Sequence, residues 1–239
     1  MMSSNPSITR AGMSQPMAGM AAVGSMAADM AARKDRLARL KARVPKPHEA
    51  SFFFYDAHFQ SEAVKILPGE YFVFNEDVLI MTTLGSCIAV CLWDRQAKIG
   101  GMNHFMLPDN GGGASDSGRY GSFAMELLIN EMLKMGASRM TLEAKVFGGG
   151  AVISGMSSIN VGERNTQFVM EYLKTERIPV VSKDVLEIYP RKVCFFPKSG
   201  KAMVKRLAPS NPDAIVAQER AAAQKAAVPA TTGGSIDLF

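Results

Sequence analysis

Most hydrophobic residues between positions 50 and 207 fall into short runs that have the length of β-strands. These runs are rich in β-branched and bulky apolar side chains, and turn-forming residues separate them, as is typical of strands in a sheet. The predicted strands cover residues 71–74, 78–81, 88–93, 99–106, 141–147, 192–196 and 202–207. Two pairs are predicted to form hairpins, one that turns at residues 94–97 and one that turns at residues 198–200.

Two further segments have the hydrophobic spacing of helices. Residues 117–135 place their apolar side chains on one helical face, and Gly136 follows as a stop signal. The residues of that face are Phe123, Leu127, Leu128 and Met132. A second helix is predicted to begin at Asn160 and to run to about residue 176. Because strands and helices mix without strict alternation, the predicted fold class is α/β or α+β, with helices covering a largely antiparallel or mixed sheet.

Composition divides the chain into three parts. The 239 residues are 47% hydrophobic and 21% charged, which is typical of one soluble globular domain. Residues 1–48 are rich in Ala, Met and Gly and are predicted to form a disordered leader, with one short helix over residues 31–44. Residues 50–207 are the predicted working domain. Residues 208–239 lose aromatic side chains, gain alanine and proline, and are predicted to be a flexible tail.

The net charge of +5 is concentrated in one basic arm at the end of the leader. Seven basic residues lie between Arg33 and Lys46 against one acidic residue, Asp35, which leaves the rest of the chain close to neutral. This distribution argues against a protein that binds the backbone of DNA or RNA. The arm is interpreted as a solvated leader, and contact with an acidic partner or a membrane surface is the alternative.

Cysteine content and hydropathy indicate a soluble protein of a reducing compartment. The three cysteines, Cys87, Cys91 and Cys194, are an odd number in a chain long enough to fold without disulfides. The leader lacks the pattern of a secretory signal, and the longest apolar stretch, residues 78–93, is interrupted and shorter than the ~20 residues of a spanning helix. We therefore expect a cytoplasmic protein with no membrane insertion.

The candidate chemistry lies in the hairpin predicted from residues 88–93 and 99–106. If its turn is centred between Arg95 and Gln96, Cys87 lies directly opposite His104, with β-carbons ~5 Å apart. A cysteine thiol has a pKa near ~8.5 and needs a partner such as histidine to supply thiolate at neutral pH. Gly85 and Ser86 precede the cysteine, and a tight backbone there could direct amide N–H groups at a developing oxyanion.

Three other interpretations of these residues are open. Cys87 and His104 could be packed core residues, which is the usual role of a single cysteine in an apolar strand. Cys87, Cys91 and His104 could be zinc ligands, but four residues along a strand separate the two cysteines by ~13 Å. The glycine run 148–150 lacks the Lys-Ser/Thr of a phosphate-binding loop and is interpreted as a turn lining the cleft. No metal and no cofactor are therefore expected.

Ordered motifs over roughly residues 64–207 resemble the CheD family, the chemoreceptor glutamine deamidases of bacterial chemotaxis. The matching pieces are LPGEYFV at 67–73, LGSCIAVCLWD at 84–94, NHFMLPD at 103–109, a GGxxxxGRY-like stretch at 112–120, EAKVFGGGAV at 143–152 and NVGERN at 160–165. The resemblance places the family's nucleophilic cysteine on Cys87 and its catalytic histidine on His104. It also implies a three-layer sandwich similar to the deamidase domain of cytotoxic necrotizing factor toxins.

The sequence departs from the family pattern at two places. The family threonine, usually six residues before the cysteine, falls on Met81, so Thr82 or Thr83 must take its role, and we favour Thr82 as the catalytic residue. Thr83 is then grouped with Gly85 and Ser86 as a substrate or oxyanion residue. A Gly-Gly pair common before the last strands of the family is absent from DVLEIYPRKV, which leaves the far wall of the site undefined.

The resemblance implies an amidohydrolase that converts glutamine side chains of methyl-accepting chemoreceptors into glutamate, with release of ammonia. Cys87 would form a thioester with the substrate, and water activated by His104 would hydrolyse it. A glutamyl methylesterase acting on the same receptor sites is an alternative, because the same thioester chemistry would release methanol. A second alternative is a non-catalytic regulatory partner of a CheC-type phosphatase. The expected partners are receptor cytoplasmic helices and a CheC-type phosphatase, with no nucleic acid.

Overall fold

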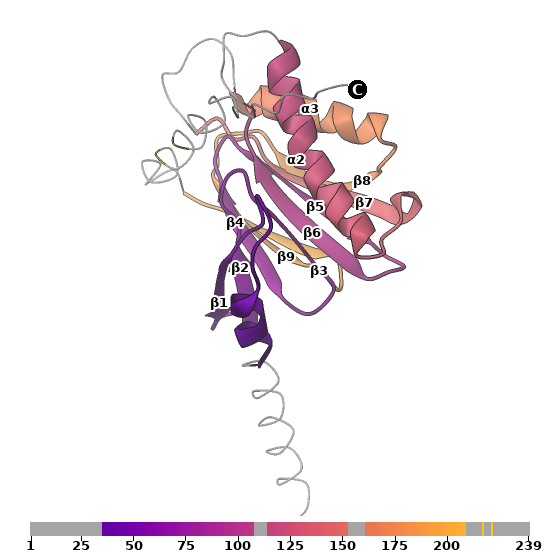
Figure 1. Cartoon of the computed structure of the whole chain (residues 1–239). Helices are drawn as coiled ribbons and strands as arrows, with labels where there is room; N and C mark the ends of the chain where they lie inside the picture. Colours follow the sequence, from indigo (N-terminus) through magenta and orange to yellow (C-terminus); the bar gives the residue numbers. More distant parts are fainter. Residues whose placement is uncertain (1–34, 108–113, 153–160, 209–216, 218–220, 222–239) are drawn as a thin grey trace, which may run out of the picture.

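The protein is built from two five-stranded sheets packed face to face, with helices on the outer face of one sheet (Figure 1). This computed structural model describes residues 35–107, 114–152 and 161–208, together with residues 217 and 221. The strands are β1 (Phe52–Asp56), β2 (Ser61–Lys65), β3 (Tyr71–Phe74), β4 (Leu79–Leu84), β5 (Ile88–Asp94), β6 (Ile99–Phe105), β7 (Leu142–Gly148), β8 (Val180–Val185), β9 (Arg191–Phe196) and β10 (Lys201–Arg206). The helices α2 (Ala114–Lys134) and α3 (Val161–Thr175) and the 3-10 turn η1 (Arg139–Thr141) complete the elements.

Both sheets are mixed, and each contains one parallel pair. The first sheet has the order β3-β6-β5-β7-β8, in which β7 and β8 are parallel. The second has the order β1-β2-β4-β9-β10, in which β2 and β4 are parallel. The chain passes from the second sheet to the first between the end of β4 and the start of β5, so residues 85–87 bridge the two sheets.

The apolar run of β5 is continuous because both faces of this strand are buried. Ile88, Val90 and Leu92 point into the core beneath the helices. Cys87, Ala89 and Cys91 point into the second core, between the two sheets. A strand in this central position has no need of the polar alternation that a solvent-facing strand shows.

The two helices cover the first sheet through apolar faces at helical spacing. Helix α2 contributes Met125, Leu128, Ile129 and Met132 to the core, all of them fully buried. Helix α3 contributes Val169 and Leu173, which lie one turn apart. The predicted helices over residues 117–135 and from Asn160 to about residue 176 therefore correspond to α2 and α3, with ends displaced by at most a few residues.

The predicted fold class is confirmed: the fold is mixed α+β and has three layers, which are the helices, the first sheet and the second sheet. Each predicted strand matches an observed one, but β1, β2 and β8 were not predicted. Strand β2 has polar residues at both ends, and three successive residues of β8, from Val181 to Lys183, are exposed, so neither has the apolar pattern of a strand. The likeness to the cytotoxic necrotizing factor domain stays a prediction.

The predicted register of the β5–β6 hairpin is wrong by two residues. Asp94 is not a turn residue but the last residue of β5, where it pairs with Ile99. Its carboxylate accepts N–H groups of Gln96 at 2.8 Å and Ala97 at 3.0 Å, and Lys98 takes a left-handed φ of 57° to close the loop. His104 therefore lies opposite Ala89 rather than Cys87.

The described part of the leader packs against the domain. Residues 35–42 form a helix, within the range predicted for it, and Leu40 is buried among residues of the second core. Arg36 pairs with the buried Glu62, and Lys46 pairs with Glu131 of α2. The basic arm is thus engaged by acidic groups of its own chain over these residues, in place of the disorder predicted up to residue 48. The rest of the predicted leader, and the predicted tail apart from residues 208, 217 and 221, lie outside the described residues.

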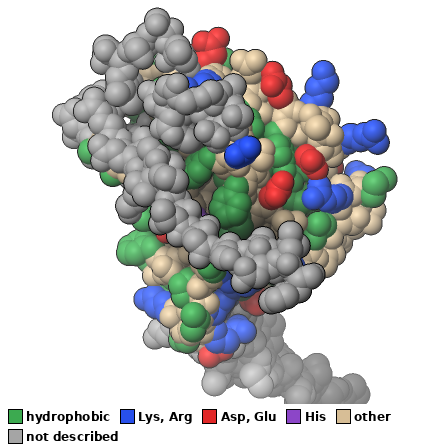
Figure 2. Space-filling model, turned by 45° about the horizontal axis from the view of Figure 1, so that its top comes forward, with side chains coloured by type: hydrophobic (Ala, Val, Ile, Leu, Met, Phe, Trp, Pro, Cys, Tyr) green, Lys and Arg blue, Asp and Glu red, His purple; other side chains and the backbone are tan. Residues whose placement is uncertain are grey.

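On the face drawn in Figure 2, basic and acidic side chains are intermixed and do not form one basic surface. Among the helices that the structure describes, none combines the length and the apolar character that crossing a bilayer requires.

Leu40→Ala tests whether the leader helix belongs to the folded domain. The substitution should lower the free energy of unfolding by about 2 to 3 kcal/mol, because it leaves a cavity at a side chain that is 2% exposed. Lys41→Ala, at an exposed position of the same helix, should change it by less than ~0.5 kcal/mol. Urea denaturation of both variants measures the difference, and equal stability of the two would show that the helix does not pack.

Candidate active site

The candidate nucleophile lies where the chain crosses from one sheet to the other. Cys87 directly precedes β5, has no solvent-exposed surface, and points into the core between the sheets. His104, in β6, is 2% exposed and lies between Met102 and Met106, which belong to the same core. The sulfur and the imidazole are therefore on the same face of the first sheet.

The corrected register makes Cys87 and His104 diagonal neighbours instead of directly opposed ones. His104 pairs with Ala89, two residues beyond Cys87 on the same face. Diagonal positions in an antiparallel pair are separated by about 7 Å, which long or aromatic side chains can span. A shift of one residue would have separated the two groups to opposite faces, whereas a shift of two preserves the shared face.

Thr82 connects the two sheets through the histidine. It lies on the inner face of β4, is 2% exposed, and its Oγ1 is 2.8 Å from His104 Nδ1 and 2.8 Å from the carbonyl oxygen of Ile66. The hydroxyl has one proton, which it donates to the Ile66 carbonyl, because that oxygen can only accept. His104 Nδ1–H must then donate to Thr82, so in the neutral ring Nε2 is the basic nitrogen.

The LPGE motif forms the turn that positions the backbone of His104. Glu70 N–H donates to the carbonyl of Leu67 at 3.0 Å, and Gly69 takes a φ of +87°, as a type II turn after proline requires. Gly69 N–H donates to the His104 carbonyl at 2.7 Å, and His104 N–H donates to the Glu70 carbonyl at 2.9 Å. Both backbone groups of the histidine are thus held by this turn.

The glycine run 148–150 packs directly against the backbone of the nucleophile. Gly149 N–H donates to the Cys87 carbonyl and Gly150 N–H donates to the Gly85 carbonyl, both at 2.8 Å. A β-carbon added to Gly148 would lie 2.1 Å from the Cys87 carbonyl oxygen, and the φ of Gly148 is +114°. The run is therefore the end of β7 and the two residues after it, packed beside the cysteine, and Gly148 is required because the two backbones touch. The cleft that the run was predicted to line stays a prediction.

Asn165 of α3 fixes the same segment from the other side. Its side-chain Nδ2 donates to the Ser86 carbonyl at 2.9 Å, and its Oδ1 accepts from Leu107 N–H at 3.0 Å. Asn165 is fully buried. Sequence reasoning missed this role, although an amide on the apolar face of a predicted helix, within the NVGERN motif, is a signal that could have indicated it.

Not every predicted site residue directs its side chain toward Cys87 and His104. Thr83 lies on the outer face of β4, opposite to Thr82, because side chains alternate along the strand. Gly85 and Ser86 contribute backbone carbonyls to the contacts with Gly150 and Asn165, and the Ser86 hydroxyl donates to Met106 Sδ at 3.7 Å. Met81, at the family's threonine position, also points outward.

Two other cysteines and one tyrosine have raised pKa values. Burial raises the pKa of the Cys91 thiol well above its usual range, an effect that Lys145 only partly offsets, and burial likewise raises the pKa of Cys194. Burial and, to a smaller extent, negative charge on Cys87 raise the pKa of Tyr120, whose hydroxyl lies beside Gly69. Tyr120 packs against the core beneath the helices, and its hydroxyl lies beside the turn that holds the backbone of His104. Within the described residues, no group of three His, Cys, Asp or Glu side chains is arranged to hold a metal ion.

The chain is similar in sequence to proteins of one known family. A sequence model of the CheD family, described as CheD chemotactic sensory transduction, matches residues 106–206. The chain is 61% identical over 204 residues to the probable chemoreceptor glutamine deamidase CheD 1 of Albidiferax ferrireducens, covering 85% of this chain and 87% of that protein. It is 50% identical over 202 residues to the probable chemoreceptor glutamine deamidase CheD of Janthinobacterium sp. (strain Marseille), covering 83% and 99%.

Among solved structures, the crystal structure of Bacillus licheniformis hypothetical protein YfiH matches 49% of each chain at 12% identity with a TM-score of 0.29. A TM-score this low does not indicate a shared fold. The two relatives, in contrast, match over most of their own length at half or more of the aligned positions. The protein therefore belongs to the CheD family.

Proposed function

We propose that this protein is a chemoreceptor glutamine deamidase, in which Cys87 is the nucleophile and His104 is the proton carrier. The names of the two relatives supply the reaction and the substrate class. The observation that carries the assignment of residues is the contact between Thr82 and His104, since it leaves Nε2 as the basic nitrogen on the face that also holds Cys87. Only the thiolate form of cysteine attacks a carbonyl, and a basic imidazole nitrogen beside the thiol supplies that form.

The reaction then proceeds through a thioester. The Cys87 thiolate attacks the side-chain carbonyl carbon of glutamine, and the protonated His104 gives its proton to the amide nitrogen, which leaves as ammonia. His104 next takes a proton from water, the resulting hydroxide attacks the thioester carbon, and the thiolate departs. The products are a glutamate side chain and ammonia, and one water molecule is consumed.

The backbone around Cys87 is proposed to stabilise the oxyanion that forms on the substrate. Backbone N–H groups at Ser86 and Cys87 are the proposed donors, and the segment that bears them is fixed by Gly149, Gly150 and Asn165. Donors that are already held in place cost no reorganisation when negative charge develops on the substrate oxygen. Thr82 is a positioning residue, because it acts on the substrate only through the imidazole.

The substrate and the cellular site follow from the same proposal. The target glutamines lie on the cytoplasmic helices of methyl-accepting chemoreceptors, so the enzyme acts in the cytoplasm, where its thiol stays reduced. A CheC-type phosphatase remains the proposed regulatory partner. A methylesterase would use the same thioester and release methanol, so the leaving group separates the two reactions.

Cys87→Ala should abolish ammonia release from a receptor cytoplasmic fragment. Cys91→Ala is the matched control, because Cys91 is a buried thiol of β5 that faces the same core as Cys87, and burial keeps its pKa high. It should retain activity. Mass spectrometry of the fragment should show amide-to-acid conversion at particular glutamines with the wild type and with Cys91→Ala only. Methanol in place of ammonia, or full activity of Cys87→Ala, would overturn the proposed function.

Thr82→Val should lower kcat by about 10²-fold with little change in KM, because the imidazole loses the acceptor that sets its orientation and tautomer. Thr82→Ser keeps the hydroxyl and should restore most of the activity. Thr83→Val, on the outer face of β4, should leave kcat unchanged. A fall in kcat for Thr83→Val equal to that for Thr82→Val would contradict the assignment.

A further inference from the structure

The segment that follows β8 has a backbone conformation that its side chains disfavour. Leu186 has a φ of 64° and Glu187 a φ of 60°, both in the left-handed region that suits glycine. Two consecutive residues with β-carbons in this region are uncommon, and for a bulky residue such as leucine the conformation is an outlier. Such conformations persist only where the surrounding structure enforces them, and they cluster at functional sites.

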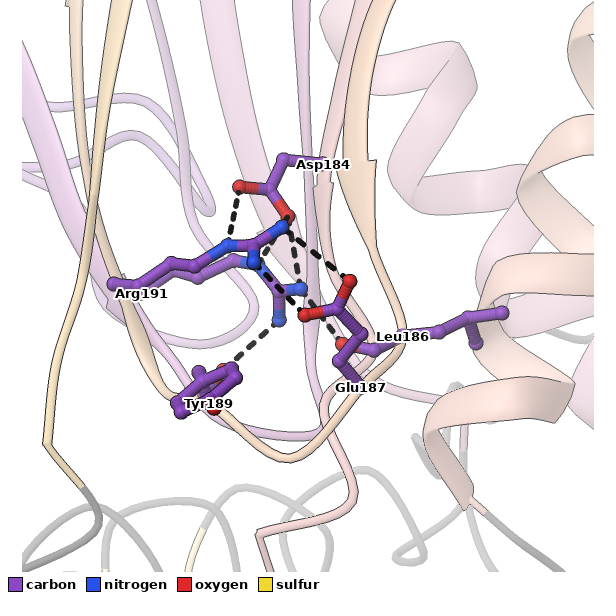
Figure 3. Close-up of polar contacts among 6 residues, drawn as sticks. Asp184, Leu186, Glu187, Tyr189 and Arg191 are labelled. Atoms are coloured by element: carbon purple, nitrogen blue, oxygen red, sulfur yellow. Dashed lines mark hydrogen bonds and ion pairs between the residues drawn. The ribbon is translucent and has the colours of Figure 1, made fainter.

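A buried arginine enforces this conformation. Arg191, which is fully buried, donates to Asp184 at 2.9 and 3.0 Å, to the Leu186 carbonyl at 2.7 Å and to the Tyr189 carbonyl at 2.9 Å (Figure 3). The Arg191 guanidinium therefore holds the segment after β8 at two points, Leu186 and Tyr189. Burial alone would raise the pKa of Asp184, but the hydrogen bonds from Arg206 and Arg191 outweigh it and lower that pKa, so the carboxylate stays charged.

The segment is joined by hydrogen bonds to the backbone beside Cys87. Leu186 N–H donates to the Gly148 carbonyl at 2.9 Å, and Ala151 N–H donates to the Glu187 carbonyl at 2.7 Å. Gly148 pairs with Ile88, the residue after Cys87, and Val185 pairs with Gly148. Leu186 is thus two strand spacings from the nucleophile, a distance of about 10 Å.

This rigid segment displays apolar side chains to solvent. Leu186 is 38% exposed and Ile188 is 57% exposed. Single exposed hydrophobic residues are ordinary, but these two lie on a backbone that is held in a disfavoured shape next to the site. Glu187 lies between these two residues in the chain, and its negative charge is balanced by Arg206, which is 2.9 Å away. A new glutamate on the substrate would therefore not meet an unpaired carboxylate here.

We infer that Leu186 and Ile188 form an apolar wall of the active site and determine which glutamines are accepted. The occupant is the substrate segment that carries the target glutamine, with an apolar side chain beside that glutamine resting on the wall. A separation of about 10 Å suits a neighbouring residue of the substrate better than the reacting amide itself. This inference rests on the proposed function, of which it specifies the substrate.

The double variant Leu186→Gly/Ile188→Ser tests the wall. It should lower kcat/KM for a receptor cytoplasmic fragment by about 10- to 100-fold, mainly through KM, because apolar contacts in a binding site have effects of this size. Activity on a short peptide with glutamine between polar residues should be unchanged. Glycine at position 186 removes a disfavoured conformation, so the unfolding midpoint should not fall. Val181→Ser, at an exposed position near the other end of β8, is the control and should match the wild type.

The outcomes separate the wall from the proposed function. Equal KM for the receptor fragment in the double variant and the wild type would overturn the wall, as would an equal loss on both substrates. If the wild type releases no ammonia from either substrate, the proposed function fails. Affinity of the fragment is then measured in the Cys87→Ala background by fluorescence anisotropy. Binding at least ten-fold weaker with the double substitution supports the wall, and unchanged binding overturns it.

Discussion

The hydrogen bond between Thr82 and His104 joins the two sheets at the point where the candidate chemistry lies. The threonine belongs to β4 in one sheet and the histidine to β6 in the other, so the bond forms only when the two sheets pack in the correct alignment. Both groups are almost completely buried, where an unpaired hydroxyl or imidazole would be costly. The pairing therefore contributes to the alignment of the sheets and to the state of the imidazole at once.

The second constraint is the close contact of backbones around Cys87. A β-carbon on Gly148 would overlap the Cys87 carbonyl oxygen, at 2.1 Å, and one on Gly150 would lie only 3.1 Å from the Gly85 carbonyl oxygen. Asn165 completes the set of contacts from helix α3. Each of the three layers thus supplies one part of the site: helix α3 supplies the amide, the first sheet supplies the sulfur and the imidazole, and the second sheet supplies the threonine.

Much of this arrangement could be predicted from the sequence, and the errors have physical causes. The shared face of Cys87 and His104 follows from strand periodicity, but the register depends on the Asp94 carboxylate, which closes the loop one residue later than a simple count suggests. Alternation along β4 places Thr82 and Thr83 on opposite faces, but which of the two points toward His104 can be told only when the inner face of the strand is known. The second sheet depends on the parallel pairing of β2 with β4, a long-range contact that leaves no local pattern.

The complete burial of Cys87 has a consequence for how the enzyme survives between encounters with its substrate. A thiolate is the form most readily oxidised by peroxide, and its rate of oxidation depends on access. The packing around Cys87 leaves its sulfur no contact with solvent and so shields it from small oxidants. Under the proposed function, a glutamine side chain reaches the sulfur only when this packing parts, so the thiol would be open to oxidation only during encounters with the substrate.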